Sequence, residues 1–103
     1  LVADATTLNL RRSFDLVAAT EFYMHLPEGD FTEVMDKVST WSNRFAANID
    51  YTASDPMYPT KTGLVYQFVH DYALAYRERG FETVMEYPVD LQTIFVAEKK
   101  TGR

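Results

Sequence analysis

The sequence predicts an α+β fold in which two amphipathic helices pack on a small antiparallel sheet. Apolar residues recur with the helical period in two stretches, residues 31–49 and 62–79. Aromatic and β-branched residues alternate in stretches near both ends of the chain, which is typical of strands. Glycine and proline residues separate these stretches, so the boundaries between elements can be read from the sequence.

The first helix is predicted over residues 31–49. Asp30 and Glu33 stand where an N-cap residue and its third-position partner belong, and both acids suit the positive end of a helix dipole. The opposite side of this helix is polar, so we expect the apolar side to face the core. The apolar side consists of Phe31, Val34, Met35, Val38, Trp41, Phe45 and Ile49.

A loop and a second helix follow. Residues 50–61 show neither period, and prolines 56 and 59 disfavour helix, so we expect an ordered loop long enough to serve a function. The helix is predicted over residues 62–79, with Gly80 in the left-handed conformation after its end. The alternative is a strand over residues 64–69 followed by a short helix from Asp71.

Strands are expected at both ends of the chain. The segment 16–26 can also be drawn as a helix capped by Ser13, but its aromatic content favours a strand. Pro88 cannot donate to a ladder and is expected in the connection between the last two strands. The predicted strands cover residues 7–10, 16–26, 81–87 and 91–97.

Two other architectures compete with this prediction. A ferredoxin-like β-α-β-β-α-β fold would result if residues 64–69 were extended. A mostly helical bundle is the third choice. The length of 103 residues is within the usual range of one domain, so residues 1–103 are expected to form a single domain.

Composition and charge exclude several classes of function. The chain has no cysteine, which excludes disulfides and thiolate metal sites and favours a cytoplasmic location. Its net charge is −5, and the acidic excess is concentrated in residues 28–55. Such a field repels phosphate backbones, so no direct nucleic-acid partner is expected. No apolar run approaches the length of a membrane span.

No motif of catalytic or cofactor chemistry is present. The serines lack a nucleophile-elbow context, and the four glycines are too far apart to form a phosphate-binding loop. We therefore expect no cofactor and no metal. The leading prediction is a non-enzymatic protein-binding domain, a subunit, adaptor or inhibitor, whose partner is another protein or a second copy in a homodimer. The binding surface would combine an acidic helix with a Tyr-rich loop, through Glu33, Asp36, Tyr51, Asp55, Met57 and Tyr58.

The alternative is a small enzyme or a ligand-binding protein. Its pocket would lie between the helices and the sheet and would use His25 or His70 together with tyrosines. A buried histidine beside a tyrosine and a carboxylate in a concavity would favour this alternative. Two histidines pointing to solvent would favour the binding domain.

Overall fold

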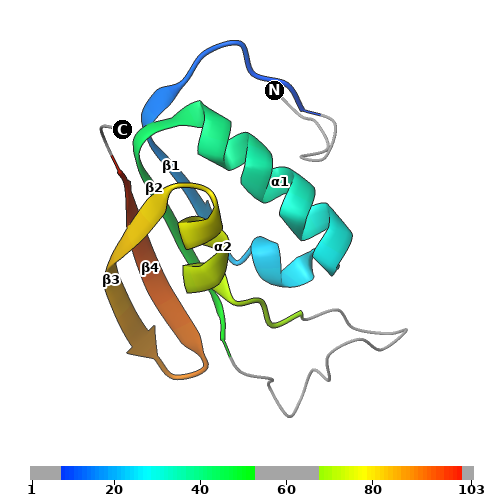
Figure 1. Cartoon of the computed structure of the whole chain (residues 1–103). Helices are drawn as coiled ribbons and strands as arrows, with labels where there is room; N and C mark the ends of the chain where they lie inside the picture. The colour runs from blue at the N-terminus through cyan, green and yellow to red at the C-terminus, as the bar shows by residue number, and fades with distance from the viewer. Residues whose placement is uncertain (1–7, 53–67, 101–103) are drawn as a thin grey trace.

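The computed structural model describes residues 8–52 and 68–100 of the chain. The described part contains two α-helices, one short 3-10 helix and four strands, shown in Figure 1. No helix within these two segments is both long enough and apolar enough to cross a membrane. In chain order the elements are β1 (Phe14–Thr20), η1 (Tyr23–His25), α1 (Glu28–Trp41), β2 (Ser42–Tyr51), α2 (Tyr72–Glu78), β3 (Phe81–Val89) and β4 (Gln92–Lys99).

The strands form one sheet in the order β1-β2-β4-β3. Strand β1 pairs with β2 in parallel, whereas β4 is antiparallel to both of its neighbours, β2 and β3. It follows that β1, β2 and β3 run in the same direction. The predicted α+β class with two helices on a sheet is confirmed, although the sheet is mixed. Neither the ferredoxin-like strand order nor a helical bundle describes it.

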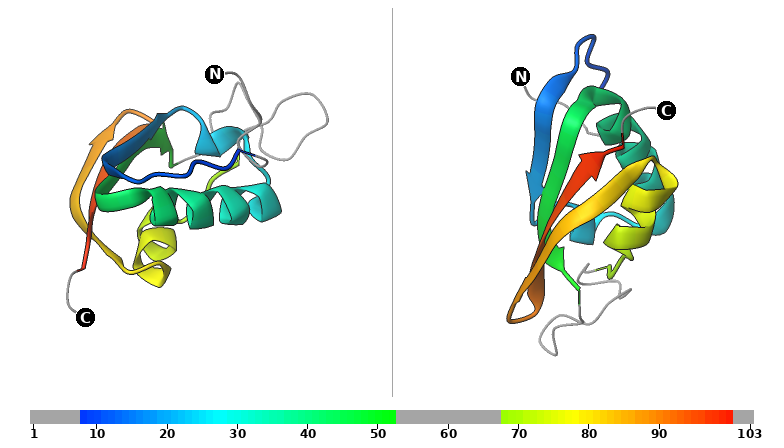
Figure 2. Two further views of the ribbon diagram at one scale, coloured as in Figure 1. Left: turned by 90° about the horizontal axis from the view of Figure 1, so that it is seen from above. Right: turned by 60° about the vertical axis from the view of Figure 1, so that its left-hand side comes forward.

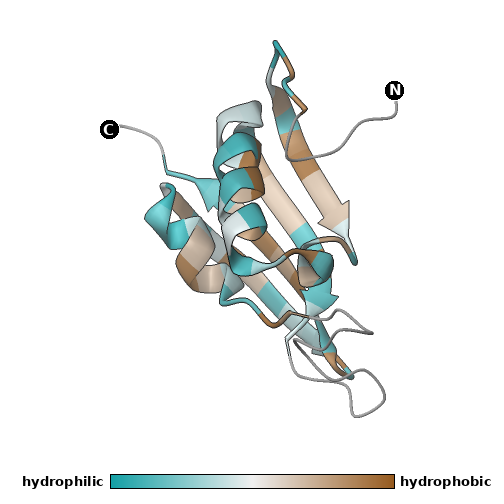
Figure 3. Cartoon of the chain, turned by 90° about the vertical axis from the view of Figure 1, so that its right-hand side faces the viewer, coloured by the Kyte–Doolittle hydropathy of each residue, from teal (hydrophilic) through white to brown (hydrophobic). Residues whose placement is uncertain are grey.

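Both helices cover the same face of the sheet, as the views in Figure 2 show. Figure 3 shows the polar outer surface of α1 and the apolar stretches along the strands behind it. The core lies between these two layers, because side chains of both helices pack on the inward side chains of β2 and β4. Its most deeply buried members are Tyr23, Val34, Met35, Ala46, Tyr72, Tyr76, Phe81 and Ala97.

The first predicted helix is wrong in its second half. Helix α1 ends at Trp41, and the chain continues as β2, one of the two central strands of the sheet. Ser42 ends the helix by donating its hydroxyl to the carbonyl of Val38 at 2.7 Å. Beyond Ser42 alternate side chains are buried, which is a period of two rather than 3.6. Phe45 and Ile49 are four residues apart, a spacing that suits either period, but in β2 they alternate with the buried Ala46 and Asn48 and so lie on the opposite face rather than on the predicted core side. Pairing with two neighbouring strands decides for the strand.

The start of α1 also differs from the prediction. The helix begins at Glu28, with Pro27 in the N-cap position and no side-chain hydrogen bond to cap it. Asp30 therefore lies in the first turn rather than at the cap. Its carboxylate still suits the positive end of the helix dipole, so the acidic signal was informative although the boundary was three residues late.

The second helix begins where the alternative prediction placed it. Helix α2 starts at Tyr72, and the carboxylate of Asp71 caps it by accepting from the backbone N–H of Leu74 at 3.0 Å. The first residues of the predicted helix, 62–67, lie outside the described residues. Phe68 has no regular structure. Gly80 follows the helix with a φ of 87°, as predicted.

The predicted strands are confirmed in part. The strand expected over residues 16–26 is β1, which ends at Thr20 and is followed by η1. Residues 8–10 have no regular structure. Pro88 lies inside β3 rather than in a connection, which is tolerated because β3 is an edge strand. Of the expected core residues, Tyr72 is buried, whereas Trp41 is only half-buried.

Candidate functional site

The strand directions bring several polar side chains to one edge of the sheet. Strands β1 and β2 end there, and the hairpin that joins β3 to β4 lies at the same edge, because Tyr51 pairs with Gln92. In open sheets with helical crossovers, ligands bind outside the carboxyl ends of the parallel strands. This carboxyl edge, at the bottom of Figure 1, is therefore the first place to look for a site.

Glu21, the residue after β1, has an unusual backbone conformation at this edge. Its φ is 52°, a region that costs a residue with a side chain roughly 1–2 kcal/mol. The conformation is held in place because the backbone N–H of Glu21 donates to the carbonyl of Ile49 at 2.6 Å. The Glu21 side chain is exposed and accepts a hydrogen bond from the amide of Gln92 at 3.1 Å. Strain of this kind is concentrated at functional sites.

An open pocket lies beside this pair. Its volume is about 300 Å³, and it is formed by the end of β2 and the β3–β4 hairpin. Thr52 connects the end of β2 to the β3–β4 hairpin. Its backbone N–H donates to the carbonyl of Leu91, and its hydroxyl lies 2.9 Å from that of Thr93. We call this the edge pocket; its walls are Tyr51, Val89, Asp90, Leu91 and Gln92.

A buried carboxylate lies behind the edge. Asp50 of β2 is fully buried and accepts hydrogen bonds from the backbone N–H of Met24 at 3.1 Å and from the amide of Asn48 at 2.7 Å. The hydroxyl of Tyr76 in turn donates to the carbonyl oxygen of the Asn48 side chain at 2.6 Å. Burial raises the pKa of Asp50, and these hydrogen bonds oppose the rise. The network joins β2 to the turn after β1 and to α2.

His70 ties a third segment to the same turn. Its side chain is buried, stacks on Phe31 with ring centroids 3.9 Å apart, and places Nε2 at 3.0 Å from the carbonyl oxygen of Tyr23 and 2.8 Å from that of Leu26. Its Nδ1 lies 3.4 Å from a carboxylate oxygen of Glu28. The imidazole therefore fixes the chain before α2 to both ends of η1. The other histidine, His25, is exposed on η1.

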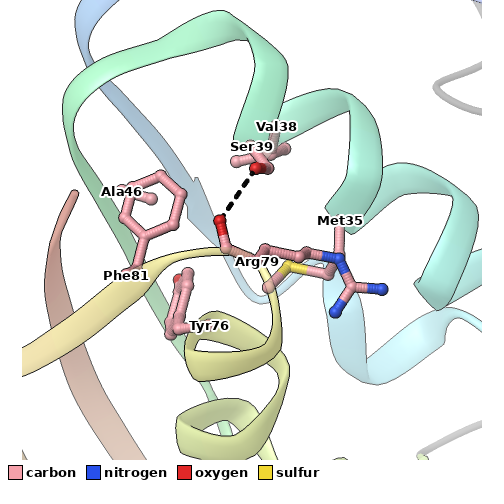
Figure 4. A pocket seen from close by; sticks show the side chains of 7 residues that line it. All are labelled: Met35, Val38, Ser39, Ala46, Tyr76, Arg79 and Phe81. Atoms are coloured by element: carbon pink, nitrogen blue, oxygen red, sulfur yellow. Dashed lines mark hydrogen bonds between the residues drawn. The ribbon is translucent and has the colours of Figure 1, made fainter. Parts of the chain in front are cut away.

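Among the described residues, one gap between the helices and the sheet is too narrow for a ligand. Figure 4 shows the gap there, between α1, α2 and the inward face of β2. Its empty volume is about 150 Å³, but none of it is wide enough for a water molecule. The hydroxyl of Ser39 lies across it, 3.4 Å from the carbonyl oxygen of Arg79. The gap is an ordinary packing defect, so the predicted pocket between helices and sheet is closed at this position.

The structure separates the residues predicted to bind a protein. Glu33 and Asp36 are exposed on α1, and Asp36 is paired with Arg79 at 2.8 Å. Tyr51 lies elsewhere, in the wall of the edge pocket. The other three residues, Asp55, Met57 and Tyr58, lie outside the described residues. A binding role for this set stays a prediction.

Sequence reasoning missed most of the residues that gather at the carboxyl edge. Asn48 and Asp50 were assigned to a helix end and a loop, which hid their alternation along a strand. Glu21 was placed inside a longer strand, and Gln92 was read only as part of a strand. Their proximity depends on the parallel pairing of β1 with β2, which leaves no local signal in the sequence.

Comparison with solved structures identifies the fold. The chain superposes on a 1,6-didemethyltoxoflavin-N1-methyltransferase from Burkholderia thailandensis, with bound 1,6-didemethyltoxoflavin and S-adenosylhomocysteine, with a TM-score of 0.75 and 12% identity. A Clostridium acetobutylicum S-adenosylmethionine-dependent methyltransferase gives 0.74 at 9% identity. Magnesium protoporphyrin IX methyltransferase from Synechocystis, with bound S-adenosylhomocysteine, gives 0.73 at 12%. No protein family profile matches the sequence, and no curated protein is significantly similar to it.

The chain covers only part of these proteins. Between 97% and 98% of the chain is aligned, but this corresponds to 50%, 64% and 50% of the Burkholderia, Clostridium and Synechocystis proteins. That residues 1–103 form one complete domain therefore stays a prediction. The shared feature is the methyltransferase-like arrangement of helices and strands described above.

These neighbours correct the leading functional prediction. They are methyltransferases, and the names of two of them refer to small molecules, 1,6-didemethyltoxoflavin and magnesium protoporphyrin IX. The prediction of a non-enzymatic protein-binding domain with a protein partner or a second copy is therefore wrong. The alternative of a small enzyme or ligand-binding protein agrees better with them. The buried His70, beside Tyr72 and near Glu28, is the arrangement that this alternative anticipated.

Proposed function

We propose that this chain forms part of the small-molecule site of an S-adenosylmethionine-dependent methyltransferase. Its fold matches that of such enzymes over almost its whole length. The observation that carries the proposal is the strained, exposed Glu21 at the carboxyl end of β1, hydrogen-bonded to Gln92, which lines the edge pocket. A cytoplasmic location, which the absence of cysteine favours, is part of the proposal.

The chemistry of the edge suits this cofactor in part. S-adenosylmethionine supplies a methyl group on a positively charged sulfonium, together with an ammonium group and hydroxyls. The Glu21 carboxylate complements a positive charge, and the Gln92 amide and the Thr52 hydroxyl are able to pair with hydroxyls. The acidic character of the chain adds a favourable field. A volume of about 300 Å³ is at the lower limit for ligand pockets, so these residues would line only one side of the site.

The chain's own residues would act by binding and orientation. Glu21 would hold a positively charged or donor group of a ligand, and Gln92 would keep the carboxylate in place from across the edge. Asp50 and His70 do not reach this surface. They would instead fix the turn of residues 21–26, because both hydrogen-bond to its backbone. Rigid support of this kind keeps a site in its productive geometry.

Binding of the cofactor by the full-length protein tests the proposal. We expect calorimetry to detect both S-adenosylmethionine and S-adenosylhomocysteine. The substitution Glu21→Gln should weaken S-adenosylmethionine binding about tenfold, because a charge-assisted contact is lost. Transfer of a labelled methyl group to small molecules with a free hydroxyl or amine would then identify the acceptor.

A matched variant controls for loss of charge alone. Glu82 is exposed near the start of β3, at the opposite end of the sheet from Glu21. The substitution Glu82→Gln removes the same charge and should change the affinity by less than about twofold. Absence of binding for both compounds would refute the proposal, and equal effects of the two substitutions would remove Glu21 from it.

A further inference from the structure

A second hollow lies on the helical side of the molecule. It is a groove between the first part of α1 on one side and, on the other, the length of α2 with the residues just before it; its volume is about 220 Å³, and we call it the amine groove for the reason developed below. It shares no lining residue with the edge pocket. The lining residues that matter are Glu28, Val69, His70, Asp71, Leu74 and Glu78.

The hydrogen bonds of His70 determine which ring nitrogen carries the proton. Nε2 lies within 3.0 Å of two backbone carbonyl oxygens, those of Tyr23 and Leu26. Carbonyl oxygens only accept hydrogen bonds, so Nε2 must be the donor. In the neutral imidazole the other nitrogen, Nδ1, is then a bare acceptor.

This acceptor faces a second acceptor. Nδ1 of His70 lies 3.4 Å from a carboxylate oxygen of Glu28, and within the described part of the chain it has no hydrogen-bond partner. The His70 side chain is only 2% exposed, so bulk water does not solvate it, whereas Glu28 is 81% exposed. A lone pair and a carboxylate in this arrangement repel each other unless a donor lies between them.

The charges of the groove select a positively charged donor. Glu28, Asp71 and Glu78 place three carboxylates in its lining. Arg79 also contributes to the lining, but its guanidinium is engaged with the carboxylate of Asp36 at 2.8 Å and with the carbonyl oxygen of Ala75 at 2.9 Å. The local field is therefore negative and attracts cations more strongly than neutral donors.

The groove also offers apolar surface to the rest of a ligand. Val69 is 44% exposed and Leu74 is 37% exposed, and both belong to its lining. A volume of about 220 Å³ is below the usual range of about 300–1,000 Å³ for drug-sized ligands, which favours a smaller molecule. The space fits a charged head group with a short carbon body.

We propose that the amine groove binds a small primary ammonium compound. One N–H of the ammonium donates to Nδ1 of His70 and another donates to the carboxylate of Glu28. A small rotation of the exposed Glu28 side chain opens the space between the two acceptors. The carbon body of the ligand lies on Val69 and Leu74.

The protonation state of His70 is the first test. In the full chain at pH 7.5, nitrogen-15 NMR of the imidazole should show a protonated Nε2 and an unprotonated Nδ1. Addition of 2-phenylethylammonium should shift the Nδ1 resonance in the direction of hydrogen-bond acceptance. A protonated Nδ1 in the free protein would overturn the proposal, because the proton itself would then be the missing donor. An Nδ1 resonance that does not respond to the ammonium would overturn it as well.

Matched ligands and variants give the second test. The neutral compound 2-phenylethanol has the same body and should bind at least about tenfold more weakly than 2-phenylethylammonium, because it lacks the charge. Glu28→Gln should weaken ammonium binding about tenfold, whereas Glu33→Gln, an exposed position of α1 outside the groove, should change it by less than about twofold. Equal binding of the two compounds, or equal effects of the two substitutions, would overturn the proposal.

The result is independent of the proposed methyltransferase function. The Glu28→Gln variant should bind S-adenosylhomocysteine as the unmodified chain does, because Glu28 does not line the edge pocket. Failure of the ammonium to bind in a protein that binds S-adenosylhomocysteine would refute only the amine groove. Binding of the ammonium without any cofactor binding would refute only the methyltransferase proposal.

Discussion

At the scale of single residues, the buried network of Asn48, Asp50 and Tyr76 is the most demanding part of the structure. Tyr76 is 1% exposed, and its hydroxyl is the donor to the Asn48 side-chain oxygen at 2.6 Å. Tyr76→Phe removes this donor, so the buried side-chain oxygen of Asn48 loses a hydrogen bond. The free energy of unfolding should therefore fall by about 1–3 kcal/mol. Denaturant titration measures this loss. Tyr87→Phe is the control, because Tyr87 is 60% exposed and its hydroxyl should contribute less than about 0.5 kcal/mol.

Asp50 gives the stability of the protein a pH dependence of defined sign. Burial raises the pKa of Asp50 above its ordinary value of 3.8, so the folded chain retains this proton at pH values where the unfolded chain has lost it. The contribution of this group to stability is therefore greatest below pH 3.8 and declines as the pH rises through the raised pKa. The free energy of unfolding, relative to that of Asp50→Asn, should decrease as the pH is raised above 3.8. An increase over this range would show that the hydrogen bonds outweigh the burial.

At the scale of elements, alanine substitutions at Gly29 and Gly80 test the effect of backbone conformation on stability, because neither substitution disturbs the packing. A Cβ at Gly80 or Gly29 would meet no atom within 4 Å, so neither substitution by alanine causes a clash. Gly80 has a φ of 87°, which alanine adopts at a cost of roughly 1–2 kcal/mol. Gly29 lies in the first turn of α1, where alanine should stabilise the protein by up to about 1 kcal/mol. Thermal unfolding should therefore move in opposite directions for the two variants.

The same elements show how far the sequence predicts this fold. Signals that act within a few residues were informative: the Gly80 conformation, the acids near the start of α1 and the aromatic strands after residue 80 are all present. The end of α1 was not predictable from periodicity, because Phe45 fits a stripe of either period. What converts residues 42–51 into a strand is pairing with β1 and β4, which are more than twenty residues away in sequence.

The candidate site was less predictable than the fold for the same reason. Glu21 and Gln92 come from opposite ends of the chain and meet only because β1, β2 and β4 are neighbours in the sheet. The sequence does identify His70 as a candidate. It gives no sign of the two acceptors of its hydrogen bonds, the carbonyl oxygens of Tyr23 and Leu26, which precede α1 in the chain. Composition alone favoured a protein-binding surface. It could not distinguish this from the observed structure, because a tyrosine-rich, acidic sequence also suits a buried aromatic core with a polar network.

At the scale of the whole molecule, the strand order predicts where the structure is most resistant to opening. Strands β2 and β4 each have a neighbour on both sides, whereas β1 and β3 are edges. Helix α1 contacts β2 and α2, and both helices cover only one face of the sheet. The inward side chains of β2 and β4 include Ala46, Asn48 and Ala97, which are at most 1% exposed. These strands should open only when the whole core is disrupted.

Hydrogen exchange measures this difference directly. Amides in the middle of β2 and β4 should exchange through global unfolding, so their protection should follow the stability lost in Tyr76→Phe. The backbone amides of β3 from Val84 to Tyr87, and that of Val89, should exchange faster, because this edge strand contains a register shift and exposed side chains at Val84, Met85, Tyr87 and Val89. If the amides of β3 were protected against exchange as strongly as those of β4, the sheet would unfold as one unit. The edge strands would then resist opening as strongly as the central strands. Protection that decreases from β4 to β3 would instead show that the hairpin beside the edge pocket opens on its own, as a region that admits a ligand must.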